Sequence, residues 1–169
     1  MKIEELLGLM KQRRSIRAYK PDPVSDEAIQ MVLEAGRWAA SSANSQPWDF
    51  IVVKDSDTKQ KLHGIVLEVI DKIKTLRDFP FLRTFRAEYV VQVPVVIVVC
   101  GDPRFVKVSI MDGVDSQMED FSFWCSVSLA VQNMLLAAQC LGLGSVVPIT
   151  TLLHLYLSRV SRQGGVFFP

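Results

Sequence analysis

The sequence predicts one domain, residues 1–169, built from both helices and strands. Apolar residues recur three and four positions apart near the N-terminus and again from Ile29, as on one face of an amphipathic helix. β-branched runs at 50–53 and 93–100 have the composition and length of buried strands. A chain of 169 residues is also long enough to bury a core of its own.

Two helices are predicted before the first strand. The first carries an apolar stripe from Ile3 to Met10, and Lys-Pro-Asp-Pro at 20–23 prevents any helix from continuing. The second begins after Ser25, a suitable N-cap, and acidic residues in its first turn favour the helix dipole. Its apolar face is predicted to comprise Ile29, Val32, Leu33, Gly36 and Ala40.

The remaining elements alternate along the chain. In order, they are a strand at 50–53, a helix over 62–73, irregular chain at 77–92, a strand at 93–100, a loop at 104–117, a helix from about 118 to 141 and a strand from about 145 to 149. The Gly-Leu-Gly at 142–144 closes the long helix instead of opening one after a strand. It is therefore not a dinucleotide-binding fingerprint.

Charge and hydropathy argue against nucleic-acid and membrane partners. The formal net charge is +1, which gives no global field to attract either. Residues 121–158 carry no charged side chain and are long enough to span a bilayer. Polar residues and a proline interrupt the stretch, so a helix buried on most faces, followed by a buried strand, is the preferred interpretation. Part of this apolar excess is expected in a subunit interface.

Cysteines and histidines indicate no metal site. Cys100, Cys125 and Cys140 stand alone in apolar surroundings and are predicted to be buried thiols of a reducing compartment. His63 and His154 are far apart in the sequence, and no nucleophile has a supporting base. The N-terminus does not resemble a signal peptide, so a cytoplasmic location is expected. No side chain is predicted to be catalytic, so in an enzyme a cofactor would carry the reaction.

The basic segment Arg-Arg-Ser-Ile-Arg at 13–17 is a candidate anion site. In extended backbone Arg13, Ser15 and Arg17 would project to the same side, with Arg14 pointing away. Forked guanidinium donors match phosphate oxygens. A solvated loop or a small nucleic-acid patch are the alternatives, and surface ion pairs would account for the arginines in the first of them.

The segment Ser-Ser-Ala-Asn-Ser-Gln-Pro-Trp at 41–48 is a candidate ring-binding loop. Its small residues permit close approach of the backbone to a ligand, and Asn44 and Gln46 offer both a donor and an acceptor to a flavin or pyrimidine edge. An ordinary polar loop is the alternative. Trp48 is expected in the core.

In this order and spacing, the two segments resemble the flavin-binding signature of the nitroreductase family of FMN-dependent oxidoreductases. Val131–Ala138 and Leu141–Ile149 extend the resemblance, which covers about residues 1–150. It implies an α+β fold with a mixed, mostly antiparallel sheet flanked by helices. It also implies an intertwined homodimer with two flavins at the interface. Residues 151–169 depart from the family as a divergent, shortened tail, in which Arg159 and Arg162 are candidate replacements for phosphate-binding cations.

The resemblance also implies a site and a reaction. The phosphate and ribityl side of FMN would be held by Arg13, Arg14, Ser15 and Arg17. The other subunit would contribute Ala40, Ser41, Ser42 and Asn44 to the same flavin. Backbone groups near the reactive edge of the ring would come from Pro148, Ile149 and Thr150. NADH or NADPH would reduce the flavin, which would reduce a nitroaromatic, a quinone or a similar small molecule. A flavin-binding protein without turnover, used for sensing or storage, is the alternative.

Overall fold

The computed structural model describes residues 2–76, 87–101 and 116–147. These residues form two compact units. The first contains residues 2–17, 22–52, 97–101 and 116–146, and the second contains residues 18–21, 53–76, 87–96 and 147. That the whole chain forms one domain stays a prediction.

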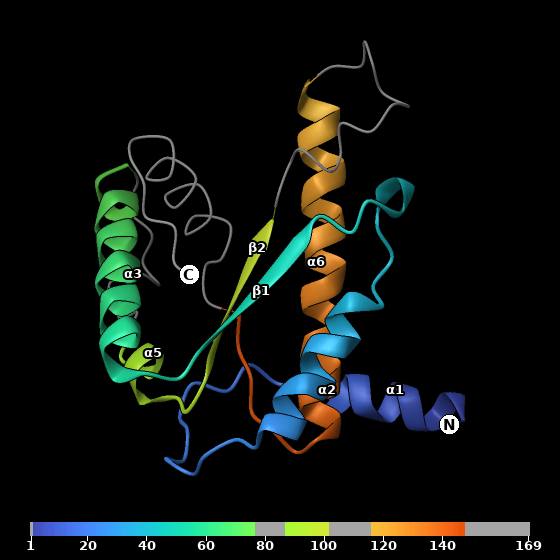
Figure 1. The fold of residues 1–169 in the computed structure, drawn as a ribbon, viewed down its shortest axis with the longest axis horizontal. Helices are drawn as coiled ribbons and strands as arrows, with labels where there is room; N and C mark the ends of the chain where they lie inside the picture. The colour runs from blue at the N-terminus through green and yellow to red at the C-terminus, as the bar shows by residue number, and fades with distance from the viewer. Residues whose placement is uncertain (1, 77–86, 102–115, 148–169) are drawn as a thin grey trace. The chain divides into compact units, whose positions relative to one another are not determined.

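Helices α1 (Ile3–Gln12) and α2 (Asp26–Arg37) form where the apolar periodicity predicts them (Figure 1). Ser25 is the N-cap of α2, and its hydroxyl accepts a 3.2 Å hydrogen bond from the Ala28 N–H. This bond satisfies one of the backbone donors that the first turn leaves without a partner. The local cap therefore fixes where the helix begins.

The buried face of α2 agrees with the prediction except at one end. Ile29, Val32 and Gly36 are buried, whereas Ala40 is exposed and lies beyond Arg37, the last residue of the helix. The predicted place of Ala40 on this face is therefore wrong, because the backbone leaves the helical path before reaching it.

Helix α6 (Ser116–Cys140) ends in a Schellman motif, as the Gly-Leu-Gly sequence predicts. Gly142 adopts a φ of 73°, a left-handed conformation that costs glycine little. The Leu143 N–H donates to the Ala138 carbonyl over 2.8 Å, and the Gly142 N–H donates to the Gln139 carbonyl over 3.1 Å. These bonds satisfy carbonyls that the helix end would otherwise leave open.

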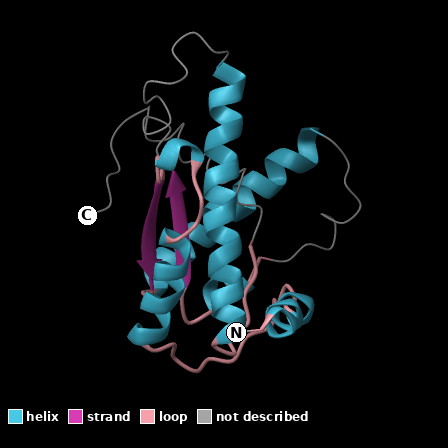
Figure 2. Cartoon of the chain, turned by 90° about the vertical axis from the view of Figure 1, so that its right-hand side faces the viewer, coloured by secondary structure: helices cyan, strands magenta, loops and turns pink. Residues whose placement is uncertain are grey.

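Strands β1 (Trp48–Val53) and β2 (Val96–Gly101) pair with each other, and their arrows run in opposite directions in Figure 2. β2 begins later than predicted because Pro94 has no N–H to give to a ladder. The predicted strand after α6 is reduced, within the described residues, to one parallel bridge between Ser15 and Ser145. Its last two positions lie outside them.

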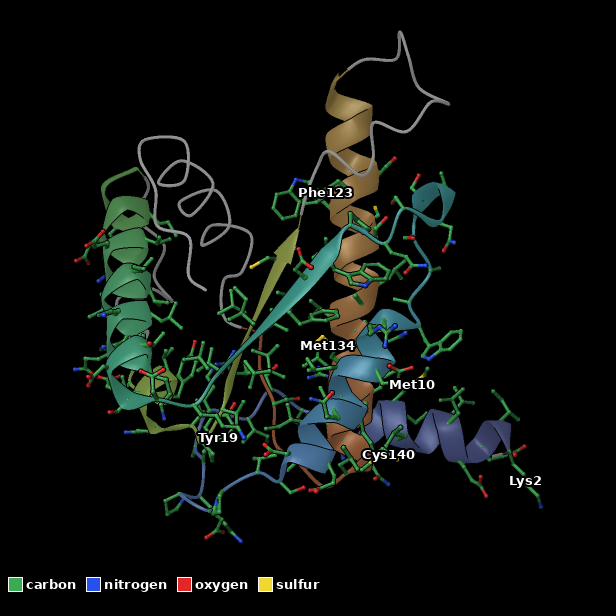
Figure 3. The ribbon with its side chains drawn as sticks, viewed as in Figure 1. Lys2, Met10, Tyr19, Phe123, Met134 and Cys140 are labelled. Atoms are coloured by element: carbon green, nitrogen blue, oxygen red, sulfur yellow. The ribbon has the colours of Figure 1, made fainter. Side chains whose placement is uncertain are left out.

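The core of the first unit lies between α2 and α6. Val32, Met134 and Ala138 are buried together, and Phe50 of β1 packs against them. Gly36 permits the close approach, because a Cβ at this position would lie 2.9 Å from both Met134 Cγ and Phe50 Cζ. Figure 3 shows Met134 on α6 where α2 crosses it.

The strand β2 packs tightly on α6 at its last residue. A Cβ on Gly101 would lie 2.6 Å from Cε2 of Phe123 and 3.1 Å from Cγ2 of Val127. Phe123 is buried, with 3% of its surface exposed, so its ring has little room to move. Figure 3 shows this side chain beside the end of β2. Only glycine fits here without displacing the ring.

In the second unit, α3 (Ser56–Leu76) packs against the short helix α5 (Tyr89–Gln92). The ammonium of Lys59, which is buried, donates to the Val93 carbonyl over 2.9 Å. Hydrogen bonds from Thr58 lower the pKa of the Asp55 carboxyl, which precedes α3.

Two predicted irregular segments differ from the structure. Residues 77–92 are predicted to be irregular, which is wrong for α5 at 89–92. Residues 77–86 lie outside the described residues. The loop predicted at 104–117 extends two residues too far, because α6 already begins at Ser116. The rest of that predicted loop, residues 104–115, lies outside the described residues.

One face of α6 is exposed in the single chain, so the burial predicted on most faces of this helix is only partly provided by its own chain. Cys125, Ser128, Leu129 and Gln132 recur at helical spacing on this face and are exposed. The prediction of buried thiols is therefore wrong for Cys125, and also for Cys140, while Cys100 is half-buried. Composition alone could not reveal which face of an apolar helix its own chain covers.

Within the described residues, one segment of α6, Ser122–Cys140, is long and apolar enough to cross a membrane. That finding rests on length and composition, and the core helix of a soluble protein passes the same test. Here the segment packs against α2 through the core of the first unit.

Candidate functional site

The basic segment leaves α1 in extended backbone, as the sequence predicts. Arg13 is the C-cap of α1, with φ −58° and ψ 132°. Ser15 then bridges to Ser145, and the Ile16 N–H donates to the Ser145 carbonyl over 3.1 Å. This pairing fixes the segment beside the chain that follows α6.

In this segment, the guanidinium groups of Arg13 and Arg17 are available to an anion. Arg13 is half-buried and Arg17 exposed, and neither forms an ion pair within the described chain. Arg14 turns back instead, and its Nη1 donates to the Lys11 carbonyl over 2.6 Å and to the Arg13 carbonyl over 2.9 Å. Arg14 thus points away from Arg13 and Arg17, as the alternation predicts, and caps the end of α1.

The second candidate segment contains a short 3-10 helix, η1 (Ser42–Asn44), with strained backbone. Ala43, Asn44 and Gln46 have φ of 50°, 53° and 45°, in the left-handed region that residues with a side chain rarely adopt. Asparagine tolerates this conformation, but alanine and glutamine gain nothing from it locally. Such clustered strain persists only where surrounding contacts hold it, and it is enriched at functional sites.

Hydrogen bonds within the loop stabilise the strained conformation. The Ser41 hydroxyl accepts from the Gln46 N–H over 3.0 Å, and the Gln46 amide donates to Asn44 Oδ1 over 3.0 Å. The Ser45 hydroxyl is buried with no hydrogen-bond partner among the described residues. Pro47 and Trp48 are buried at the end of the loop, which confirms that Trp48 belongs to the core.

A contact from α6 also holds the loop, and sequence reasoning missed it. The Ser42 N–H donates to the Ser126 hydroxyl over 3.1 Å. Ser126 has 2% of its surface exposed. A serine in the middle of an apolar helix was the available signal, but its partner lies 84 positions away in the chain.

The predicted flavin-binding segments contact different parts of α6, one its middle and the other the chain after its end. Ser126 contacts the η1 loop, whereas Ser145, which follows the helix, contacts the basic segment. At about 1.5 Å per residue, α6 rises by about 21 Å from Ser126 to Cys140. One copy of the chain therefore does not bring the two segments together. Pro148, Ile149 and Thr150, and the whole tail, lie outside the described residues.

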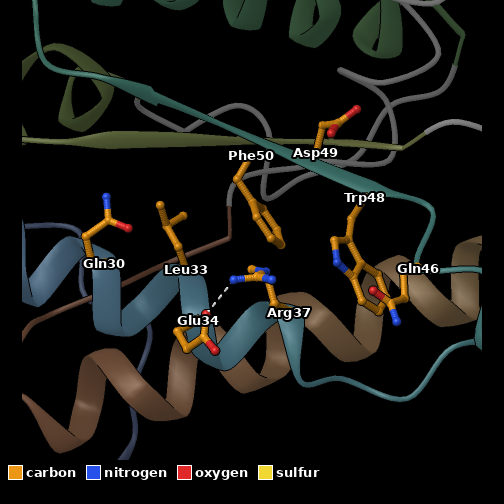
Figure 4. Close-up of a pocket in the computed structure, with 8 residues that line it drawn as sticks. All are labelled: Gln30, Leu33, Glu34, Arg37, Gln46, Trp48, Asp49 and Phe50. Carbon is orange, nitrogen blue, oxygen red and sulfur yellow. Dashed lines mark hydrogen bonds and ion pairs between the residues drawn. The ribbon is translucent and has the colours of Figure 1, made fainter.

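A pocket of about 340 Å³ lies between α2 and β1, and sequence reasoning did not predict it (Figure 4). It is lined by Gln30, Leu33, Glu34, Arg37, Gln46, Trp48, Asp49 and Phe50. The Glu34 carboxylate accepts from Arg37 Nη1 over 2.8 Å and from Trp38 Nε1 over 2.7 Å. Arg37, the one cation among the described residues that line this pocket, is thus already paired with the Glu34 carboxylate.

Comparison with known proteins now identifies the family. The model of the nitroreductase family matches residues 10–152, which include the basic segment, the η1 loop and α6. The chain belongs to the nitroreductase family. The oxidoreductase class predicted from the sequence is thereby confirmed at the level of the family, and so is the α+β fold.

Curated relatives of this nitroreductase-family chain cover most of its length. A protein of Archaeoglobus fulgidus provisionally named NADH dehydrogenase/NAD(P)H nitroreductase is 36% identical over 144 residues, covering 85% of this chain and 67% of its own. Iodotyrosine deiodinase 1 of Rattus norvegicus is 34% identical over 154 residues. The match covers 86% of this chain and 52% of the deiodinase.

A solved structure shares the fold. A provisionally named nitroreductase from Desulfovibrio desulfuricans, in complex with FMN, superposes with a TM-score of 0.57 at 33% identity, covering 83% of this chain and 66% of its own. The chain thus spans between about half and two thirds of the length of these three proteins.

The donor set of this nitroreductase-family chain fits FMN. Arg13 and Arg17 offer charge without a carboxylate partner among the described residues, as a phosphate requires. Asn44 and Gln46 are exposed and carry both amide donors and acceptors for a ring edge. The Ser45 hydroxyl, which has no hydrogen-bond partner in the described part of the chain, adds a buried polar group in the same loop.

Cys100 of β2 is expected to be the least reactive of the three cysteines. Burial, reinforced by the nearby Asp49 carboxylate, raises the pKa of its thiol, so less of the nucleophilic thiolate is present at neutral pH. We expect Cys100 to react with a thiol-specific disulfide reagent after the exposed Cys140, and its rate to rise only as the pH is made more alkaline. A Cys100→Ser variant identifies the slow phase. Equal rates for both thiols in the folded protein would contradict the expectation.

Proposed function

We propose that the protein is an FMN-dependent oxidoreductase. It passes two electrons from NADH or NADPH through the flavin to a nitroaromatic, a quinone or a similar small acceptor. The observation that carries the proposal is the pair of guanidinium groups on Arg13 and Arg17, which have no ion-pair partner among the described residues, combined with the strained η1 loop. The solved relative in complex with FMN supports the choice of cofactor.

The chain's own residues would bind and orient the cofactor. Arg13, Ser15 and Arg17 would hold the phosphate, with Arg14 shaping the segment from its position on the end of α1. The η1 loop would present Asn44 and Gln46 to the ring. Donors aimed at a ring edge that gains negative charge stabilise it in the reduced form. FMN, when bound, supplies the two-electron chemistry, for which the protein needs no side-chain nucleophile.

A homodimer would complete the site. The two segments lie about 21 Å apart along α6, so a second copy is needed to place its η1 loop against the basic segment. The exposed face of α6 and the exposed Ile3, Leu7 and Met10 of α1 offer apolar surface to such a partner. Burial of that surface would favour association. A cytoplasmic location, without a nucleic-acid or membrane partner, is part of the same proposal.

The visible absorption spectrum of the purified protein, recorded across a gel-filtration run with added FMN, tests the proposal. We expect the absorption of oxidised flavin to elute with a dimer. A dimer that stays colourless in excess FMN would remove the cofactor from the proposal. Flavin that elutes with a monomer would instead remove the shared site.

Turnover distinguishes the enzyme from a flavin-binding protein that stores or senses the cofactor. We expect NADH or NADPH to bleach the bound flavin under anaerobic conditions, and a quinone to restore its colour. Running both nucleotides in parallel identifies the donor. Bound flavin that neither nucleotide bleaches would favour the storage or sensing role.

A further inference from the structure

We infer that Ser126 of α6 is a positioning residue for the flavin, acting through the η1 loop; the inference rests on the proposed function. Its hydroxyl is the contact described above between the long helix and this loop, over 3.1 Å from the Ser42 N–H. Ser126 itself is buried, and among the described residues its hydroxyl bonds to Ser42 and Ser122 and not to Asn44 or Gln46.

The orientation of the Ser126 hydroxyl is fixed from both sides. A serine hydroxyl has one proton to donate and two lone pairs that accept. The proton goes to the Ser122 carbonyl one turn earlier on α6, over 2.8 Å, which leaves a lone pair directed at the Ser42 N–H. The acceptor is thus held in place by a bond within its own helix.

The loop needs such an anchor because its backbone is strained. Three of its residues, Ala43, Asn44 and Gln46, have positive φ. The bonds within the loop join only its own residues. Ser126 ties the loop to the rigid core, next to the point where the strained stretch begins.

The anchor is expected to act on FMN affinity through the population of the loop conformation. If the binding-competent conformation is only partly populated, the apparent Kd rises in inverse proportion to that fraction. The Ser126→Ala variant removes the acceptor and leaves the Ser42 N–H without it. Alanine is the stronger helix former, so α6 itself is not weakened by the change.

The test compares the wild type with Ser126→Ala, Ser126→Thr and Ser56→Ala. Ser56 is exposed at the start of α3 and controls for the same chemical change outside the anchor and the proposed dimer surface. We expect Ser126→Ala to raise the Kd for FMN about threefold to tenfold, the range for loss of one hydrogen bond. The Ser126→Thr variant keeps the hydroxyl and is expected to restore the affinity, and Ser56→Ala to leave it unchanged.

A second readout needs no flavin. Amide hydrogen exchange of residues 41–46 in the flavin-free protein is expected to be faster in Ser126→Ala than in the wild type. Thermal unfolding, measured on every variant, fixes a temperature at which all are folded. Wild-type protein that binds no FMN would overturn the proposed function and this inference with it. Wild-type binding of FMN, with unchanged affinity and loop exchange in Ser126→Ala, would overturn the inference alone.

Discussion

Replacing Arg13 or Arg17 by alanine is expected to weaken FMN binding about 10-fold to 150-fold. A charge-assisted hydrogen bond contributes about 1.5–3 kcal/mol, and about 1.4 kcal/mol corresponds to a factor of ten in Kd. Neither guanidinium forms an ion pair among the described residues, so the substitution leaves no described carboxylate without its partner. The fold is therefore expected to survive, and titration of the flavin-free variants with FMN, followed by quenching of flavin fluorescence, gives the two constants.

Two further variants separate a specific phosphate contact from a general loss of charge. Lys61→Ala removes one positive charge from an exposed position on α3 and is expected to leave the affinity for FMN unchanged. Arg14→Ala is expected to change the Kd for FMN less than Arg13→Ala or Arg17→Ala does. The Nη1 of Arg14 is already bonded to the Lys11 and Arg13 carbonyls. Unchanged affinity in both Arg13→Ala and Arg17→Ala would remove the phosphate from this segment.

Local chemistry made the start of α2 and the end of α6 predictable from the sequence. Ser25 caps α2 through a bond to a residue three positions away, and Gly142 closes α6 with bonds that span one turn. These signals depend on neighbours in the chain, which the sequence displays directly. The alternation of Arg13, Ser15 and Arg17 in the basic segment is also read from neighbouring residues, and its extended backbone is predicted correctly.

The conformation of the η1 loop could not be predicted, although its role was proposed. Nothing in the sequence indicates that Ala43 adopts a left-handed conformation, because alanine has no local interaction that favours it. The backbone there is held by contacts that include Ser126, which is distant in the chain. Strain of this kind is imposed by tertiary structure and has no local signature.

The exposed face of α6 could not be located from the sequence for a different reason. The uncharged stretch predicted burial, but hydropathy does not say whether a face is covered by the same chain or by another molecule. The exposed Cys125 and Leu129 lie on the face that α2 does not cover. The separation of the two candidate flavin-binding segments along this helix is the reason for proposing a second copy.

Truncating Met134 to alanine is expected to lower the free energy of unfolding by about 2–5 kcal/mol, the range for removing a large buried side chain from a packed core. Met134 has 7% of its surface exposed and packs with Val32 and Ala138 between α2 and α6. Its removal would leave a cavity beside Gly36, where no side chain can fill the space. Chemical denaturation of the flavin-free protein, at one fixed protein concentration, measures the change.

The Gly36→Ala variant supplies the decisive comparison. In the wild type the added Cβ would lie 2.9 Å from Met134 Cγ and 2.9 Å from Phe50 Cζ, so overpacking is expected to cost about 1–3 kcal/mol. In the Met134→Ala background part of that space is free, and the cost of the second substitution should shrink. The two changes should therefore couple favourably in a double-mutant cycle, because the residues share one contact. An equal cost of Gly36→Ala in both backgrounds would mean that α2 and α6 do not approach each other at this point.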